Sequence, residues 1–84
     1  MRHIILITGA GKGIGKAIAL EFAGHAVKNP EFRPVLLLSS RTAADLEIAA
    51  AECRALGAEA VVMQADISEN AQAYRLAETV IERY

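Results

Sequence analysis

Three short runs of apolar residues divide the chain, and a longer segment with helical periodicity follows each run. The runs lie within residues 3–8, 34–40 and 60–65, and their apolar centres are not interrupted by polar residues. Continuous apolar runs of this length are typical of strands that are buried on both faces. The pattern therefore predicts three buried strands, each followed by a helix.

The segments between the runs give the expected helices their bounds. The first segment carries apolar residues at a spacing of three and four between residues 13 and 28. Thr42 and Asp45 have the spacing of a capping box, so we expect the second helix to begin at Thr42. Gly57 is well placed for the left-handed residue past the end of that helix. Ser68 is expected to cap the third helix, which runs to residue 84.

The order of these elements predicts an α/β fold, because strands that alternate with helices form parallel sheets with right-handed crossovers. We expect a three-stranded parallel sheet of order 3-2-1 with helices on both faces, the first two on one face and the third on the other. The 84 residues are too few for separate cofactor and substrate domains, and a hydrophobic content of 54% is enough to bury one core. Residues 1–84 are therefore expected to form a single domain.

Charge and cysteine content argue against several classes of function. The formal net charge is −1, with acids and bases interleaved, so no basic surface for nucleic acid or anionic lipid is expected. The one cysteine, Cys53, cannot form an internal disulfide, and no Cys/His spacing indicates a metal site. No apolar run approaches the roughly 20 residues of a membrane span. We expect a soluble, cytoplasmic protein with no nucleic-acid, membrane or metal partner.

A glycine-rich segment, TGAGKGIG at residues 8–15, joins the first expected strand to the first expected helix. Glycines let the backbone approach a ligand closely, and the helix N-terminus behind them offers unpaired N–H groups and a positive dipole to a phosphate. A position between strand and helix is the context that a dinucleotide-binding loop requires. We interpret the segment as a cradle for the phosphates of a cofactor. The alternative is a tight turn with no ligand.

A P-loop is the competing phosphate motif, and it fits less well. Gly15 and Lys16 supply the Gly-Lys pair near its end. Ala10, however, stands where the first glycine of the motif belongs, and Ala17 replaces the hydroxyl that binds magnesium. Hydrolysis of a nucleoside triphosphate is therefore not expected.

Thr8-Gly9, Gly13 and Gly15 match the pattern TGxxxGxG, and in this the chain resembles the short-chain dehydrogenase/reductase family. Residues 39–42 (SSRT) and 65–68 (ADIS) look like the ribose-phosphate and adenine contacts of that family. The resemblance covers the whole chain. The segments TGAGKGIG and LLLSSRTAADLE are most similar to members of the sepiapterin-reductase type. The resemblance implies half of a Rossmann fold, a dinucleotide-binding unit. The cofactor contacts that it implies are Gly9, Gly11, Lys12, Gly13, Ile14, Gly15, Ser40, Arg41, Asp66 and Ile67.

The residues after the second expected strand favour NADP over NAD. An NAD site usually has an acid there, which binds the ribose hydroxyl, whereas this chain has Ser39 and Ser40. The resemblance implies that Arg41 and Lys12 face the 2′-phosphate. Charge-assisted hydrogen bonds of about 1.5–3 kcal/mol would favour NADP by roughly 10- to 150-fold. The alternative is that both cations are solvated surface charges.

Asp66 directly follows the third expected strand. The resemblance implies that its carboxylate accepts a hydrogen bond from the adenine amino group, with Ile67 alongside. The alternative is a helix-capping role next to Ser68, and the two roles are compatible.

The residues that carry out the family's chemistry are not in the sequence. The family uses a serine and a Tyr-x-x-x-Lys pair, whereas Tyr74 is followed four residues later by Glu78, and Tyr84 is the last residue. No catalytic residue is therefore expected. We expect the N-terminal part of an NADPH-dependent carbonyl reductase, which binds the adenosine-phosphate end of NADP with a Kd of roughly 0.1–1 mM and does not catalyse the reaction alone.

An unprotected sheet edge predicts self-association. In the order 3-2-1 the first strand lies at an edge, and unpaired edges pair with other chains. We expect a homodimer that forms through this edge or through the under-covered sheet face. The alternative function is then a self-associating structural fragment, a minimal fold made deliberately, in which the nucleotide site is intact but unused.

Overall fold

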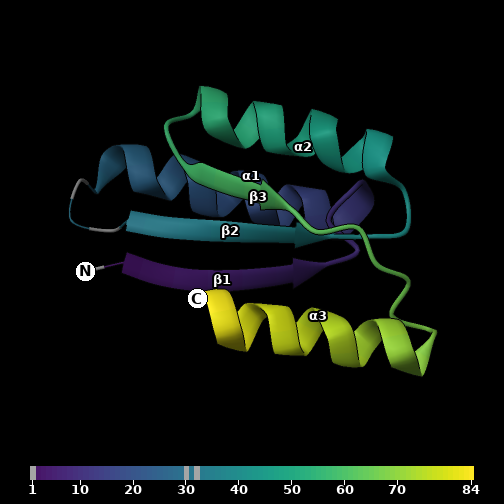
Figure 1. Ribbon diagram of the computed structural model, residues 1–84. Coiled ribbons are helices and arrows are strands. Elements are labelled where there is room, and N and C mark those ends of the chain that lie inside the picture. Colours follow the sequence, from purple (N-terminus) through teal and green to yellow (C-terminus); the bar gives the residue numbers. More distant parts are fainter. Residues whose placement is uncertain (1, 30, 32) are drawn as a thin grey trace.

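The computed structural model describes residues 2–29, 31 and 33–84, which form three strands and three helices in alternation (Figure 1). In chain order they are β1 (Arg2–Thr8), α1 (Gly13–Lys28), β2 (Arg33–Ser39), α2 (Ala43–Ala55), β3 (Glu59–Val62) and α3 (Asn70–Arg83). The predicted order of elements is confirmed. Within this described part of the chain, no helix has the length and apolar character needed to cross a membrane.

β2 is the central strand of a parallel sheet, with β1 on one side and β3 on the other. Leu38 of β2 pairs with Ile7 of β1 and with Val62 of β3, so the carboxyl ends of the three strands lie at the same edge. The predicted three-stranded parallel sheet of order 3-2-1 is therefore confirmed.

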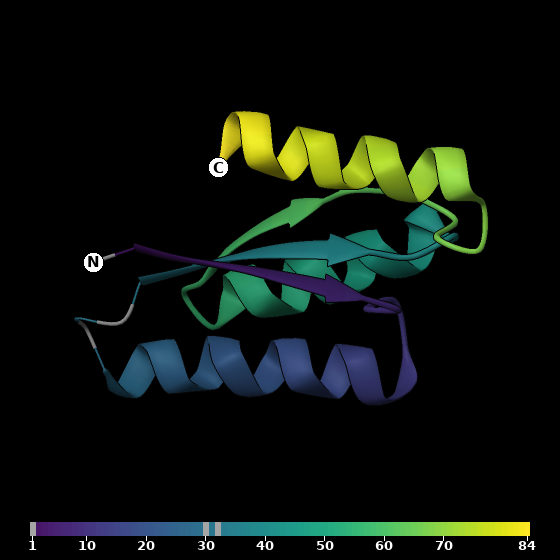
Figure 2. The same ribbon diagram turned by 90° about the horizontal axis from the view of Figure 1, so that it is seen from below.

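The helices form two layers, one on each face of the sheet (Figure 2). α1 and α2 pack against each other on one face, and α3 lies alone on the other. Right-handed connections place α1 and α2 on the same face, because β1, β2 and β3 follow one another in one direction across the sheet. The predicted distribution of helices is confirmed.

The main core lies between the sheet and the layer of α1 and α2. Leu36 and Leu38 of β2 are fully buried there against Leu46 and Cys53 of α2 and Ala19 of α1. A fully buried leucine contributes about 1.5–3 kcal/mol, so this layer is a main source of stability. Burial also raises the pKa of the Cys53 thiol, which keeps it neutral as a small apolar residue of the core.

The opposite face of the sheet is covered less completely. Leu37 of β2 is fully buried on this side, whereas Ile4 and Leu6 of β1 keep 38% and 40% of their surface exposed. Among the apolar residues of α3, Leu76 is buried but Ile81 is exposed. A hollow lined by Val61 and Met63 also lies between β3 and α3, so α3 covers this face of the sheet incompletely.

The start of α2 differs from the prediction. Thr42 is the N-cap residue, but its side chain makes no capping hydrogen bond. The Thr42 N–H donates instead to Ser40 Oγ, at 3.3 Å. The predicted capping box is therefore wrong, and the Asp45 carboxylate pairs with Lys12 of the glycine-rich loop.

The start of α3 lies later than predicted. Glu69 is its N-cap residue, and the helix begins at Asn70. The N–H and the hydroxyl of Ser68 both donate to Asp66 Oδ1, at 3.0 and 2.6 Å. Ser68 does not cap α3, because its hydrogen-bonding groups close a turn with Asp66.

β3 ends at Val62, before the predicted end at residue 65. Backbone hydrogen bonds nevertheless continue past it. The Met63 N–H donates to the Leu38 carbonyl and the Ala65 N–H donates to the Ser40 carbonyl, both at 2.9 Å. The segment after β3 therefore stays tied to the segment after β2.

The first turn of α1 packs directly on the loop that follows β1. A Cβ at Gly15 would overlap the carbonyl of Gly9 and lie 3.2 Å from the Cα of Ala10. Gly24, in the same helix, has open space at its Cβ position. Close approach of backbone therefore requires glycine at position 15 and not at position 24.

Gly15→Ala should lower the free energy of unfolding, measured with urea, by roughly 1–3 kcal/mol, because the added methyl group overlaps backbone. Gly24→Ala is the matched control and should raise it by about 0.5–1 kcal/mol, because alanine loses less backbone entropy than glycine in a helix. Equal effects of the two substitutions would contradict the close approach.

Candidate functional site

The segments that follow the three strands meet at one edge of the sheet and enclose a hollow of about 510 Å³. The carboxyl edge of a parallel sheet is where ligands bind in open α/β folds. The lining residues are Gly9, Gly11, Lys12, Ser40, Arg41, Thr42, Asp45, Ala65, Asp66, Ile67 and Ser68.

Most of the residues expected to contact a cofactor lie around this hollow. The residues brought together there are Gly9, Gly11, Lys12, Ser40, Arg41, Asp66 and Ile67. Gly13, Ile14 and Gly15 are not among its lining residues, because they form the first turn of α1. Ile14 is exposed on the outer side of that helix, where it lines a separate apolar hollow.

Four further lining residues were not singled out as contacts: Thr42, Ala65 and Ser68, which lie in the segments 39–42 and 65–68 that resemble the family's contacts, and Asp45, which lies outside them. The capping-box pattern predicts that the side chains of Thr42 and Asp45 bind the backbone of α2, so it does not indicate that they line the hollow. A usable signal was present, because both lie close behind Arg41 at the start of a helix that follows a strand.

The glycine-rich loop is held in place by backbone geometry. Gly9 and Gly13 have φ values of 63° and 64°, in the left-handed region that favours glycine. Between them the Ala10 N–H donates to the Ser39 carbonyl at 3.0 Å, and the Ala10 side chain is buried. The loop after β1 is therefore fixed to the end of β2.

Gly11 sits where the loop meets the first turn of α2. A Cβ at Gly11 would lie 2.9 Å from the Cβ of Asp45 and 3.0 Å from the Oγ of Ser40. A larger residue would therefore have to push into the hollow or displace α2. This is the close backbone approach that a phosphate-binding loop needs.

The charged side chains of the hollow are two bases and two acids. Lys12 Nζ lies 3.6 Å from Asp45 Oδ2, with 85% of the lysine side chain and 31% of the aspartate side chain exposed. Arg41 is exposed, and its backbone carbonyl accepts a hydrogen bond of 2.8 Å from Gln64 Nε2. Lys12 lies in the loop after β1, and Arg41 lies in the segment after β2. Asp45 lies in the first turn of α2, and Asp66 lies in the segment after β3.

Asp66 is ionised and held by its neighbours. The hydrogen bonds from the hydroxyl and the N–H of Ser68 lower the pKa of the Asp66 carboxyl, and the charge of Arg41 adds to the effect. The Asp66 N–H donates to Gln72 Oε1 at 2.7 Å, which ties it to the first turn of α3. Since Glu69 is the N-cap residue of α3, the Asp66 carboxylate is not the cap of this helix.

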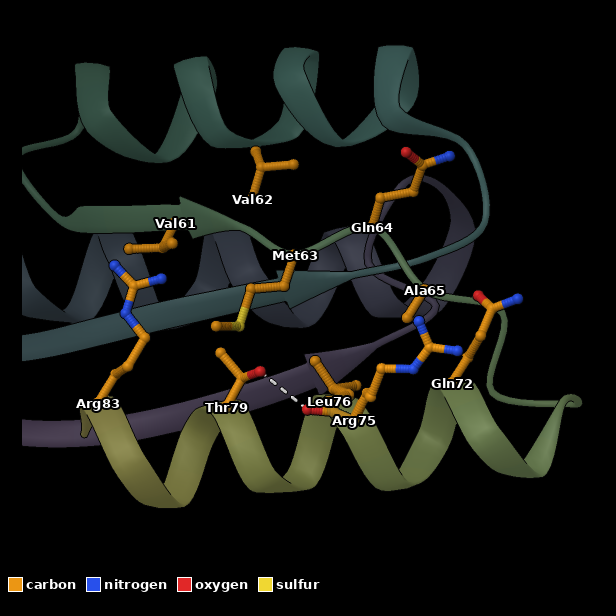
Figure 3. A pocket seen from close by; sticks show the side chains of 10 residues that line it. All are labelled: Val61, Val62, Met63, Gln64, Ala65, Gln72, Arg75, Leu76, Thr79 and Arg83. Carbon is orange, nitrogen blue, oxygen red and sulfur yellow. Dashed lines mark hydrogen bonds between the residues drawn. The ribbon is translucent and has the colours of Figure 1, made fainter.

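A second hollow, of about 390 Å³, lies between β3 and α3 (Figure 3). Met63 and Leu76 lie in its middle, and Arg75 and Arg83 extend toward it from α3. None of the residues expected to contact a cofactor lines it. Within residues 2–29, 31 and 33–84, no three His, Cys, Asp or Glu side chains gather as metal ligands would.

A model of the short chain dehydrogenase family matches residues 3–84. This match extends over almost the whole sequence and agrees with the loop and the sheet described above. The chain belongs to the short-chain dehydrogenase/reductase family.

Two curated relatives show how the chain relates to longer proteins. It is 62% identical to a sepiapterin reductase of Chlorobaculum tepidum over 84 residues, which is 100% of this chain and 34% of the relative. It is 40% identical to mouse estradiol 17-beta-dehydrogenase 11 over 95% of this chain and 24% of that protein. The chain therefore spans about a third or less of these relatives.

Solved structures share the fold with high similarity. A metagenomic short-chain oxidoreductase in complex with NADP matches with a TM-score of 0.82 at 26% identity, over 95% of this chain and 33% of that one. The NADH-dependent reductase A1-R′, complexed with NAD, matches with a TM-score of 0.77 at 32% identity, over 98% of this chain and 31% of that one. The resemblance to a Rossmann fold is confirmed, and both dinucleotides occur among the similar structures.

Ser68→Ala should raise the pKa of Asp66 toward its ordinary value of 3.8, because the hydroxyl donor is lost and only the N–H remains. Carboxyl carbon NMR would follow the titration. Since the pKa is lower in the folded state, the charged carboxylate stabilises the fold above about pH 3.8 and this effect disappears as the pH falls through the folded pKa. An unchanged midpoint in Ser68→Ala would contradict this role of the hydroxyl.

Proposed function

We propose that the chain is the NADP(H)-binding part of an NADPH-dependent carbonyl reductase of the sepiapterin-reductase type. The observation that carries this proposal is the hollow at the carboxyl edge, where glycine backbone, two bases and an ionised acid meet. The 62% identity to a sepiapterin reductase supports the subtype. The bound nicotinamide would supply the hydride, and the chain's own residues hold the adenosine end.

The adenine would lie against the segment after β3. The Asp66 carboxylate stays ionised, so it can accept a hydrogen bond from the adenine amino group. The half-exposed Ile67 side chain offers an apolar surface to the ring. The hydrogen bond between the Ala65 N–H and the Ser40 carbonyl fixes this segment beside the one that follows β2.

The 2′-phosphate would lie against the segment after β2. Ser40 offers a hydroxyl, and Arg41 and Lys12, which line the same hollow, offer positive charge. No carboxylate stands at the last residues of β2 or directly after it, where an NAD site usually has one. The pyrophosphate would then follow the loop toward the N-terminus of α1, where the first N–H groups of a helix have no partner within it.

In an NMR titration of the labelled chain, NADP should bind with a Kd of roughly 0.1–1 mM and more tightly than NAD. Arg41→Ala should weaken NADP binding by about 10-fold and leave NAD binding nearly unchanged, because the guanidinium meets only the 2′-phosphate. Arg83→Ala, which removes the same charge from the far end of α3, is the control. Equal losses for both nucleotides would contradict the proposed contact.

We also propose that the chain forms a homodimer through β1. In the described part of the sheet β1 pairs only with β2, so its other edge presents N–H and carbonyl groups beside the exposed side chains of Ile4 and Leu6. Such an edge is a template for another strand. Two copies related by a twofold axis would join their β1 strands antiparallel and extend both sheets.

Sedimentation of the chain at several hundred micromolar should show a dimer. Leu6→Lys should shift it to monomer, because a charged side chain beside an edge opposes pairing. Ile48→Lys, which places the same charge on the exposed side of α2, should leave the dimer intact. A wild-type chain that stays monomeric would overturn the proposal.

A further inference from the structure

We infer that Asp45 sets the cofactor selectivity of the hollow and reduces its preference for NADP. The inference rests on the proposed nucleotide-binding function and goes beyond it, because sequence reasoning placed no acid near the 2′-phosphate. Asp45 lines the same hollow as Lys12, Ser40 and Arg41. Its carboxylate comes from the first turn of α2 rather than from the end of β2.

The contacts of Asp45 place it beside the expected 2′-phosphate. Its Cβ lies 2.9 Å from the position that a Cβ at Gly11 would take, and Ser40 Oγ lies 3.0 Å from that same position. Its Oδ2 lies 3.6 Å from Lys12 Nζ. Asp45 is thus between the loop after β1 and the segment after β2, which together would hold the phosphate.

The charges explain how Asp45 would act on NADP. Lys12 is highly exposed and pairs with the Asp45 carboxylate, so a 2′-phosphate must share the ammonium group with this carboxylate or displace it. An acid in the first turn also offsets the positive end of the α2 dipole, which would otherwise favour an anion. Both effects weaken the binding of the phosphate, and neither acts on a nucleotide that lacks it.

The same carboxylate suits the ribose of NAD. A carboxylate near the end of the second strand usually accepts a hydrogen bond from the 2′-hydroxyl. Asp45 supplies such a group from the neighbouring helix, close to Ser40. The hollow therefore combines two cations that favour a phosphate with one acid that favours a hydroxyl, and we expect it to accept both nucleotides.

Asp45→Asn tests the inference, because it keeps the shape of the side chain and removes its charge. The ratio of the Kd for NAD to the Kd for NADP, measured by NMR titration, should rise by about 5- to 10-fold, which corresponds to about 1–1.4 kcal/mol. Glu47→Gln is the matched control, since it removes the same charge from an exposed position of α2 outside the hollow. Asp45→Ser is a second variant, and a dispersed amide spectrum checks that each variant is folded.

The pairing of Lys12 with Asp45 gives a second readout. Lys12→Met should weaken NADP binding by less than about 2-fold in the wild-type background, where the ammonium group is shared with the Asp45 carboxylate, and by about 5-fold in the Asp45→Asn background. Equal losses in both backgrounds would overturn the inference, as would a nucleotide ratio that Asp45→Asn leaves unchanged or lowers. If wild type and variants bind neither nucleotide at 10-fold above the roughly 1 mM limit, the proposed function itself is wrong and the inference falls with it.

Discussion

The parallel pairing of β2 with both of its neighbours decides where each residue of the candidate site lies. Because Leu38 pairs with Ile7 on one side and Val62 on the other, the three strands end at one edge and their following segments meet there. β2 can be central because its apolar side chains are buried on both faces of the sheet. A shift in this register would separate the glycine-rich loop from the segments that carry the charged side chains.

Backbone contacts, more than side-chain contacts, build the hollow. The Ala10 N–H ties the first loop to the end of β2, and the Ala65 N–H ties the third segment to Ser40. Close approaches at Gly11 and Gly15 then bring α2 and α1 against the loop. Charged side chains are added to this rigid frame, so their substitution should alter nucleotide choice with little effect on the fold.

The sequence predicts the strands, the helices, the strand order and most of the residues that line the hollow, because apolar periodicity and glycine spacing are local signals. The sequence does not predict the hydrogen-bonding and charge partners of the side chains. Thr42 and Asp45 satisfy the capping-box pattern, yet the Thr42 N–H goes to Ser40 and the Asp45 carboxylate to Lys12. Whether these groups bind within α2 or to the neighbouring segments depends on how closely α2 approaches Gly11. Residue spacing along the sequence does not encode this tertiary distance.

The most direct test of the account is where the adenine of a bound nucleotide lies. Nuclear Overhauser effects between the adenine protons of adenosine 2′,5′-bisphosphate and the methyl groups of the labelled chain would locate it. The account predicts contacts to Ile67, at the carboxyl edge of the sheet. Contacts to Met63 and Leu76, in the hollow between β3 and α3, would place the nucleotide elsewhere and contradict the central claim.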